Sequence, residues 1–375
     1  EELASRLGIQ VPQEKSGEHR IKAQTAPLTG IMAQAAAYYR EQLKASPQAV
    51  DYLKRRGLTG EIAARFGLGY APPGWQNLER IFPDYQAPAL LEAGLVIENE
   101  AGKRYDRFRE RIMFPILDTR GNVIGFGGRI LAQEKGDAEG GPKYLNSPET
   151  PLFEKGRELY GLPQARAAIR DSGMVIVVEG YMDVVALAQH GIGNAVATLG
   201  TATTPNHVHK LLRQAERVVF CFDGDNAGLK AAWRALEASL EQIADDKFAG
   251  FVFLPTGHDP DSFVRELGAM AFNELVQRSV PLTEFLLREL KAQIDLNTAE
   301  GRSRLVHEAK PLLQRLNAPL LRLQLIKALA ETSGFSQAEI EAGCGLKSLG
   351  RLGGLGGRGG RGFAPRPLAR QAISG

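Results

Sequence analysis

The sequence contains very little cysteine: Cys221 and Cys344 are the only two among 375 residues. Two cysteines cannot assemble a zinc cluster, and they exclude the dense disulfide framework of small secreted domains. We therefore expect no zinc site in this chain. The low cysteine content also fits a reducing cytoplasm.

Long hydrophobic runs are missing as well. No segment approaches the roughly 18 apolar residues that a membrane-spanning helix needs, and the N-terminus shows no signal peptide. The content of 43% apolar and 24% charged residues is ordinary for a globular protein of two or three domains. We expect no membrane partner. Because the chain begins at Glu1 instead of methionine, we also expect a fragment of a longer protein.

The small net charge of +3 hides an uneven distribution along the chain. Residues 101–170 hold 13 basic and 9 acidic residues, a net of +4, whereas residues 171–270 hold 7 and 13, a net of −6. A basic surface beside an acidic, cation-binding one indicates a polyanionic substrate. Ordinary variation in surface charge is the alternative.

Six carboxylates follow three short apolar runs, at residues 174–178, 218–222 and 251–254. Runs of β-branched and aromatic residues of this length predict buried parallel strands. The six acidic residues are Glu179 and Asp183 after the first run, Asp223 and Asp225 after the second, and Asp259 and Asp261 after the third.

Expected strands alternate with helical segments between residues 171 and 268. The strands lie near 174–178, 194–198, 217–222 and 250–254. This order predicts a parallel sheet with right-handed crossovers, and ligands of such sheets bind at the carboxyl ends of the strands. All six acids fall there. Because clustered carboxylates repel one another unless cations neutralise them, we predict a site for Mg²⁺ or Mn²⁺.

The segment 223–228, Asp-Gly-Asp-Asn-Ala-Gly, first suggests a calcium loop of the EF-hand type. That interpretation fails because Ala227 stands at a ligand position and Arg234 replaces the required glutamate. An aspartyl-phosphate nucleophile and a metal clamp for phosphoryl transfer remain, and only the clamp gives every acid a role. Glu179 fits either a metal ligand or a general acid/base. A charge or cap at a helix start is the alternative for Asp183, Asp259 and Asp261.

Other segments have simpler signals. Helix formers at 32–40, a helix start at Ser46-Pro47 and a cap at Thr59 predict helices in the first third of the chain. Apolar runs around residues 118–122 predict a β-hairpin. Residues 271–342 have a helical pattern.

Several motifs, in their order along the chain, resemble a known family. The strand followed by Glu179-Gly-Tyr-Met-Asp183, and then residues 222–228, resembles a Toprim domain, the fold shared by bacterial primases, topoisomerases and some nucleases. Flanking motifs are similar to those of the bacterial replicative primase of the DnaG type. They lie at 52–58, 66–71, 107–116, 121–129, 142–150 and 254–262, and the resemblance covers about residues 35–340.

The resemblance implies an α/β fold in which a central Toprim sheet, parallel and Rossmann-like, joins a mixed α+β basic subdomain and a C-terminal helical bundle. Residues 346–375 are expected to be a flexible linker toward a missing helicase-binding domain, since eight of the 13 residues at 350–362 are glycine and three are arginine. The other expected parts are a linker from a missing zinc-binding domain at 1–33, the basic subdomain at 34–170, the Toprim domain at 171–270 and the helical subdomain at 271–345.

The family further implies the catalytic core of a DNA-dependent RNA primase, a nucleotidyltransferase that makes short RNA primers on single-stranded DNA. The 3′-hydroxyl of one nucleotide attacks the α-phosphate of the next and pyrophosphate leaves, assisted by two or more Mg²⁺ or Mn²⁺ ions. By resemblance, Glu179 matches the catalytic glutamate, and Asp223 and Asp225 match a metal-binding pair. Further positions of the metal site match Asp183, Asp259 and Asp261.

The partners that the resemblance implies are a DNA template, ribonucleoside triphosphates, an RNA primer and the replicative helicase, the last through the missing C-terminal domain. We expect a monomer that acts in the bacterial cytoplasm, at the nucleoid.

Basic and polar residues before the Toprim segment are expected to contact triphosphates or the template backbone. Arg107, Arg109 and Arg111 alternate, which puts them on one face if the segment is extended. Arg129 follows two glycines, where the backbone allows close approach of a ligand. The predicted set is Arg107, Arg109, Arg111, Arg129, Lys143, Tyr144, Asn146, Lys155 and Arg157, with Tyr144 able to stack on a base.

Two other functions stay open. Some Toprim proteins cleave DNA strands, although 375 residues show no separate large domain to carry the nucleophilic tyrosine of a topoisomerase. A non-catalytic module that binds single-stranded DNA or a helicase is the other alternative. The acidic residues argue against it, because an inert module has no need to gather like charges.

Overall fold

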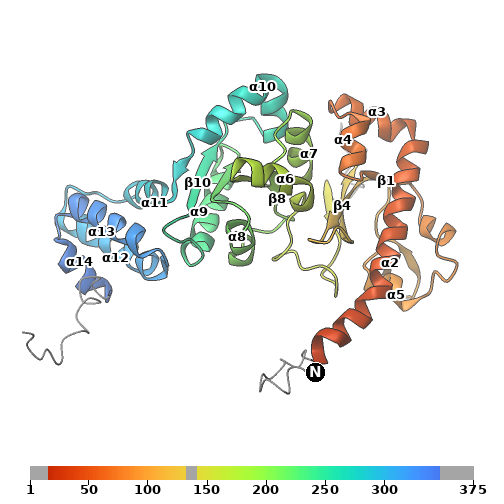
Figure 1. Cartoon of the computed structure of the whole chain (residues 1–375), viewed down its shortest axis with the longest axis horizontal. Helices are drawn as coiled ribbons and strands as arrows, with labels where there is room; N and C mark the ends of the chain where they lie inside the picture. The colour runs from red at the N-terminus through yellow and green to blue at the C-terminus, as the bar shows by residue number, and fades with distance from the viewer. Residues whose placement is uncertain (1–15, 132–141, 347–375) are drawn as a thin grey trace, which may run out of the picture.

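The computed structural model describes residues 16–131 and 142–346, with side chains from residue 27 onward. Three parts follow one another along the long axis of the molecule (Figure 1). The N-terminal subdomain forms one end, the parallel sheet with its helices lies in the middle, and the last four helices form the other end.

The N-terminal subdomain combines helices with a four-stranded antiparallel sheet of order β1-β4-β5-β6 and a two-stranded sheet, β2-β3. Its elements are α2 (Ser16–Ala45), α3 (Pro47–Arg55), α4 (Gly60–Arg65), β1 (Gly69–Ala71), the 3-10 helix η1 (Asn77–Arg80), α5 (Pro88–Glu92), β2 (Val96–Glu98), β3 (Arg104–Asp106), β4 (Arg111–Leu117), β5 (Val123–Ile130) and β6 (Tyr144–Asn146).

Local sequence signals explain the ends of these elements. The hydroxyl groups of Ser46 and Thr59 accept hydrogen bonds from the first turns of α3 and α4, as their capping positions predict. The predicted hairpin is confirmed, with β4 and β5 antiparallel around a turn in which Asp118 accepts from the backbone of Arg120 and Asn122.

The first helix corrects the predicted linker at residues 1–33. Residues 16–33 belong to α2, whereas residues 1–15 lie outside the described part of the chain. Leu28, Met32 and Ala35 are buried at a spacing of four and three residues, which is one face of a helix. From Leu28 onward this face packs on the N-terminal core beside Phe126 of β5, a tertiary contact that the sequence pattern does not show.

The central sheet has five strands in the order β11-β10-β9-β7-β8, and every pairing except the edge pair β10-β11 is parallel. The four predicted parallel strands are confirmed. The elements are α6 (Leu162–Ser172), β7 (Met174–Val178), α7 (Tyr181–Gln189), β8 (Ala195–Ala197), α8 (Pro205–Leu212), β9 (Arg217–Phe222), α9 (Asn226–Leu240), β10 (Phe248–Phe253), α10 (Pro260–Gln277) and β11 (Val280–Pro281).

The order in which the chain adds strands to this sheet changes side at β7. It moves from β7 to β8 on one side and then crosses to β9 on the other side, so β7 and β9 are neighbours with α7 and α9 following them. Such a switch point opens a crevice at the carboxyl ends of the two strands. Glu179 follows β7 and Asp223 follows β9, so the topology brings two predicted catalytic residues to this crevice.

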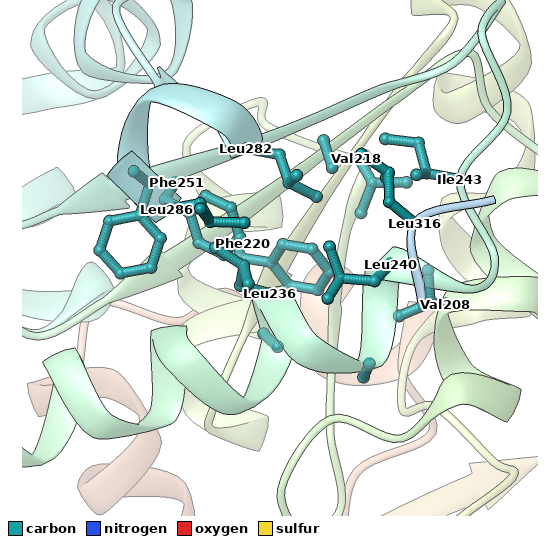
Figure 2. Packing of buried hydrophobic residues seen from close by; sticks show 14 of the residues in the cluster. Val208, Val218, Phe220, Leu236, Leu240, Ile243, Phe251, Leu282, Leu286 and Leu316 are labelled. Atoms are coloured by element: carbon teal, nitrogen blue, oxygen red, sulfur yellow. The ribbon is translucent and has the colours of Figure 1, made fainter. Parts of the chain in front are cut away.

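Alternate residues of the strands serve two different cores, which is why these strands are apolar throughout. In β9, Val218 and Phe220 join one core, and Val219 and Cys221 join the other. Figure 2 shows Phe220 and Phe251 of the sheet packed with Leu282 and Leu286 of the helix that follows β11.

The last four helices therefore share a core with the sheet and do not form an isolated bundle. The predicted boundary at residue 271 falls inside α10, and the predicted linker from 346 lies outside the described residues apart from its first residue. Within the described part, no helix is long and apolar enough to cross a membrane. The four helices are α11 (Leu282–Lys291), α12 (Ala299–Arg315), α13 (Pro319–Ser333) and α14 (Gln337–Cys344).

Candidate active site

Five of the six predicted acids line one cavity of about 310 Å³ at the switch point of the sheet. The floor is made by the ends of β7 and β9, and the N-terminus of α10 closes one side. The cavity is lined by Arg56, Arg129, Lys143, Tyr144, Asn146, Glu179, Gly180, Tyr181, Met182, Asp183, Gly200, Cys221, Asp223, Asp259, Pro260 and Asp261.

Asp225 is the acid outside this lining. It is exposed, and its Oδ1 accepts a hydrogen bond of 2.7 Å from the backbone N–H of Gly228, so it caps α9. Its charge still acts on the site, because it raises the pKa of Glu179 and of Asp223.

The carboxyl groups at the strand ends are partly or fully buried and lie near other carboxylates, and both conditions raise their pKa values. Burial, followed by the charges of Asp223 and Asp225, raises the pKa of Glu179. Burial, followed by Asp259 and Asp225, raises the pKa of Asp223. Burial and Asp259 hold the pKa of Asp183 well above its usual range. The free site thus disfavours its own ionised form, and bound cations would relieve this.

Asp259 and Asp261 differ although they bracket one proline. Asp259 caps α10 in a reciprocal arrangement with Ser262, and these hydrogen bonds outweigh the effect of burial and lower its pKa. Asp261 is 2% exposed and holds two arginines, with Arg56 Nη1 at 3.0 Å and Arg265 Nη1 at 3.6 Å. Both oxygens of Asp261 are therefore engaged by cations of the protein.

Arg129 forms a basic wall of the same cavity, opposite in charge to the acids. Its guanidinium lies between two aromatic rings, 5.3 Å from the centroid of Tyr52 and 5.7 Å from that of Tyr144. The residue is 7% exposed, and its Nε and Nη1 have no hydrogen-bond partner among the described residues. Two buried, unpartnered N–H donors beside a cavity favour an anionic ligand.

The structure separates Arg107, Arg109 and Arg111, which the sequence predicted on one face. The extended segment is broken at Glu110, which has a φ of 52°. Arg111 is buried, and its Nη1 donates to the carbonyls of Gly128, Pro142 and Lys143. These contacts join the start of β4 to β5 and to the segment before β6, and Arg111 lies outside the cavity lining.

Asn146 joins the two subdomains. Its Oδ1 accepts from the hydroxyl of Tyr181, its Nδ2 donates to the carbonyl of Leu199, and its own carbonyl accepts from the guanidinium of Arg107. With its amide engaged on both atoms, Asn146 positions the rim of the cavity.

Lys155 and Arg157 lie outside the cavity lining. The exposed side chain of Arg157 pairs with Glu154 at 2.9 Å. The carbonyl of Lys155 contacts the ring Nε2 of the buried His207 at 2.9 Å, which fixes the backbone of this loop against α8.

Sequence reasoning gave no role to two residues of the cavity, Arg56 and Tyr181. Arg56 ends a run of three basic residues at the C-terminus of α3, which is typical of a solvated helix end. Tyr181 lies inside the motif Glu179-Gly-Tyr-Met-Asp183, yet its ring stacks on Phe114 at 5.4 Å between centroids. Only the juxtaposition of the subdomains shows that both residues face this site.

We expect Arg56→Ala to lower the free energy of unfolding by about 1–2 kcal/mol. Its removal leaves the 3%-exposed Asp261 carboxylate with only the more distant Arg265, and the 31% exposure of Arg56 reduces the effect of a fully buried pair. Urea denaturation measures this. The neighbouring exposed Arg55, changed to alanine, is the control and should stay within about 0.5 kcal/mol of the wild type. Equal stability of the two variants would contradict the ion-pair argument.

The donor set fits a hard divalent cation. Carboxylate oxygens are the ligands that Mg²⁺ and Mn²⁺ prefer, and the raised pKa values of Glu179, Asp183 and Asp223 are what an uncompensated cation site shows. Within residues 16–131 and 142–346, no three acidic, histidine or cysteine side chains are close enough to enclose an ion alone. Mg²⁺ needs few direct carboxylates because it retains water and substrate phosphates as ligands.

Comparison with known proteins gives three family matches along the chain. Residues 38–166 match the family described as DNA primase catalytic core, N-terminal domain, and residues 173–246 match the Toprim domain. Residues 283–338 match the DnaB-helicase binding domain of primase. Sequence analysis expected helicase binding through a missing C-terminal domain, whereas this match covers α11 to α13 and the start of α14.

Individual relatives of this chain agree with the family matches. A DNA primase of Pseudomonas aeruginosa is 51% identical over 350 residues, which is 91% of this chain and 52% of that protein. A crystal structure of a DNA primase domain from Pseudomonas aeruginosa, 51% identical, aligns with a TM-score of 0.79 over 84% of this chain and 99% of that one. A structure of the DnaG primase catalytic domain bound to ssDNA, 44% identical, aligns with a TM-score of 0.79 over 85% and 99%. The chain spans about half the length of the curated relatives that it matches.

Proposed function

This chain belongs to the bacterial DNA primase family, and from that membership we propose that it is the RNA-polymerising core that makes short primers on single-stranded DNA. The reaction is a nucleotidyl transfer from ribonucleoside triphosphates. Primases and Toprim domains generally use divalent metal ions, and we assign this role here to two or more Mg²⁺ or Mn²⁺ ions.

One observation carries the proposal: a single cavity is lined by both carboxylates and cationic side chains, and the buried Arg129 among them has N–H donors with no hydrogen-bond partner in the described residues. Glu179, Asp183 and Asp223 supply carboxylates, and Arg129 and Lys143 supply cationic side chains. Phosphoryl transfer needs this pairing, because the triphosphate must be held by cations while charge develops on its oxygens.

The side chains of the cavity suit different parts of the reaction, according to their chemistry. Arg129, with Nε and Nη1 free among the described residues, is suited to donate hydrogen bonds to phosphate oxygens. The exposed Lys143 extends this positive wall toward solvent. Glu179 and Asp223 are the first choice as ligands of the divalent ions, which supply neutralisation of phosphate charge when bound. The alternative role for Glu179 is that of a general base that accepts the proton of the attacking hydroxyl.

The partners follow from this activity. We assign the chain a single-stranded DNA template, ribonucleoside triphosphates and an RNA primer, bound at the cavity. We also assign it the replicative helicase, whose contact surface the family match at residues 283–338 supports. The protein would act as a monomer at the bacterial nucleoid during chromosome replication.

The test is incorporation of labelled ribonucleotides onto an RNA primer already annealed to a DNA template, with Mg²⁺ or Mn²⁺. A supplied primer removes the initiation step from the measurement. The wild-type chain is compared with Glu179→Gln and with Glu331→Gln, an exposed glutamate of α13 that serves as the control. We expect template-directed extension by the wild type and the control, and none by Glu179→Gln.

Two results would overturn the proposal. Extension that persists unchanged in Glu179→Gln would remove the proposed site. Absence of extension with both metals, together with nicking of supercoiled plasmid, would favour strand cleavage instead.

We expect Lys143→Ala to weaken binding of single-stranded DNA and to flatten its dependence on salt. Loss of one phosphate contact lowers the slope of log affinity against log salt concentration by about 0.7 for a single strand. Anisotropy of a labelled oligonucleotide over a series of salt concentrations measures the slope. Lys103→Ala is the matched control, since that lysine is exposed and lies outside the cavity lining. An unchanged slope in Lys143→Ala would exclude a phosphate contact.

A further inference from the structure

His207 is a buried histidine that lies outside the lining of the catalytic cavity. It stands in the first turn of α8 with 0% of its surface exposed, whereas His209, two residues further along the same helix, is exposed. A buried imidazole has two polar nitrogen atoms that need partners, and here both have one. The two partners belong to two different loops of the chain.

The ring of His207 links these loops through its opposite nitrogen atoms. The N–H of Thr204 donates to Nδ1 at 3.2 Å, and Nε2 contacts the carbonyl oxygen of Lys155 at 2.9 Å. Since an N–H can only donate and a carbonyl can only accept, these contacts fix the neutral tautomer with its proton on Nε2. Burial also lowers the pKa of His207, which favours the neutral ring.

The loop that carries Lys155 is held at neighbouring backbone groups as well. The N–H of Lys155 donates to the carboxylate of Glu149 at 3.1 Å. The next carbonyl, that of Gly156, accepts a hydrogen bond of 2.6 Å from the hydroxyl of Thr204. The backbone of Lys155 is thus held by a carboxylate on one side and by the imidazole on the other.

The loop that contains Thr204 leads back to the cavity. It occupies residues 198–204, between β8 and α8, and β8 is paired with β7. Gly200 of this loop lines the cavity, and the carbonyl of Leu199 accepts from the amide of Asn146, another lining residue. The imidazole therefore supports the β8 side of the cavity, whereas the acidic residues of the cavity belong to other elements.

We propose that His207 is a positioning residue of the polymerase, whose ring joins the loops at 154–157 and 198–204 and so presets the β8 side of the cavity for the ribonucleoside triphosphate. The inference rests on the proposed primase function. A loop that is already ordered loses little further freedom when a ligand binds, so the link lowers the cost of binding. Without the ring, ligand binding has to order both loops, and the contribution of the contact appears in the KM.

Primer extension at varied ribonucleotide concentration tests the effect on the reaction. His207→Asn keeps an acceptor for the N–H of Thr204, but its shorter side chain loses the donor to Lys155, whereas the longer amide of His207→Gln can still donate there. We expect His207→Asn to raise the KM about tenfold, as loss of one hydrogen bond does, with kcat changed less than about twofold. His207→Gln should restore the KM to within about threefold of the wild type. The exposed control, His209→Gln, should match the wild type. An unchanged KM in His207→Asn, or a loss confined to kcat, would overturn the proposal.

Limited digestion with trypsin detects the link without any polymerase activity. Trypsin cleaves after lysine, and the bond after Lys155 lies in the loop that the imidazole holds. We expect cleavage at this bond to be about tenfold faster in His207→Asn than in the wild type, because cleavage follows the population of the open loop. Cleavage at sites outside the loop should keep its rate, which mass spectrometry of the fragments measures.

A second variant covers the case in which the buried substitution does not fold. Glu149→Ala changes an exposed side chain and removes the other contact of the Lys155 backbone, so it should speed cleavage after Lys155 in the same direction. Cleavage at the wild-type rate in His207→Asn, or in Glu149→Ala where His207→Asn does not fold, would overturn the proposal.

The positioning role and the catalytic proposal fail differently. If His207→Asn extends primers with the KM of the wild type while Glu179→Gln is inactive, the positioning role is wrong and the primase function stands. If the wild-type chain never extends a primer, the catalytic proposal is wrong and the positioning role falls with it, whereas faster cleavage after Lys155 would still establish the link between the loops.

Discussion

Replacing Asp223 with asparagine is expected to stabilise the metal-free protein while it removes metal-dependent primer extension. Burial and the charges of Asp259 and Asp225 raise the pKa of Asp223, so its ionised form is disfavoured in the folded chain. Asparagine keeps the shape and removes the repulsion. We expect a melting temperature about 2 °C higher without metal. Extension should fall by at least about 100-fold, since even residues that only orient metal ligands have effects of 10- to 100-fold.

The gain in stability from Asp223→Asn depends on pH in a defined direction. A carboxyl group whose pKa is raised on folding holds its proton more tightly in the folded state than in the unfolded one. Its contribution to stability is therefore most favourable at acid pH and declines as pH rises through the ordinary and then the raised pKa. The advantage of Asp223→Asn should be present at neutral pH and disappear at acid pH.

Calorimetric melting with and without Mn²⁺ measures these effects. Mn²⁺ should raise the melting temperature of the wild type more than that of Asp223→Asn. Asp259→Ala is the contrasting variant, because hydrogen bonds from Ser262 lower the pKa of Asp259, and loss of this cap should destabilise the chain by about 1 kcal/mol. A metal-free Asp223→Asn that melts below the wild type, or that gains equally from Mn²⁺, would contradict the crowded-charge argument.

Much of the central sheet could be predicted because its signals are local. Apolar runs such as 174–178 have the length of a strand, and the acids at their ends coincide with the carboxyl ends of β7 and β9. Parallel pairing then brings residues from distant motifs to one edge without further information. The positions of Glu179 and Asp223 at this edge were predictable for this reason.

Contacts across subdomains were not predictable from local patterns. Arg56 and Asp261 are 205 residues apart in sequence, and nothing in either neighbourhood specifies the pair. The alternation of Arg107, Arg109 and Arg111 predicted a shared face, but the chain turns at Glu110, and the buried Arg111 donates to backbone carbonyls at the end of β5 and before β6. Helix at residues 28–33 was missed because Leu28 and Met32 are buried in one core with Phe126 of β5, a tertiary effect that local patterns do not show.

Substitution of Gly228 by alanine should disrupt the site although alanine favours a helix. Gly228 lies in the first turn of α9, where alanine would gain up to about 1 kcal/mol over glycine from helix propensity alone. A Cβ at this position, however, would overlap the carbonyl of Asp223, and its next neighbours are the other backbone atoms of that residue. Relief therefore requires displacement of the Asp223 backbone, because no flexible side chain can yield. The N–H of Gly228 also donates to Asp225, so the cap of α9 would weaken.

We expect Gly228→Ala to lose a net of about 1–3 kcal/mol, the usual effect of overpacking, and to extend primers about 100-fold more slowly, as a displacement near 1 Å produces. Urea denaturation and primer extension measure the two losses separately. Gly60→Ala is the matched control, because a Cβ there meets nothing within 4 Å at the first residue of α4. That variant should gain about 0.5 kcal/mol and keep full activity. If Gly228→Ala instead behaved like Gly60→Ala, propensity would outweigh the clash, and the close approach of α9 to Asp223 would have no role in placing this carboxylate.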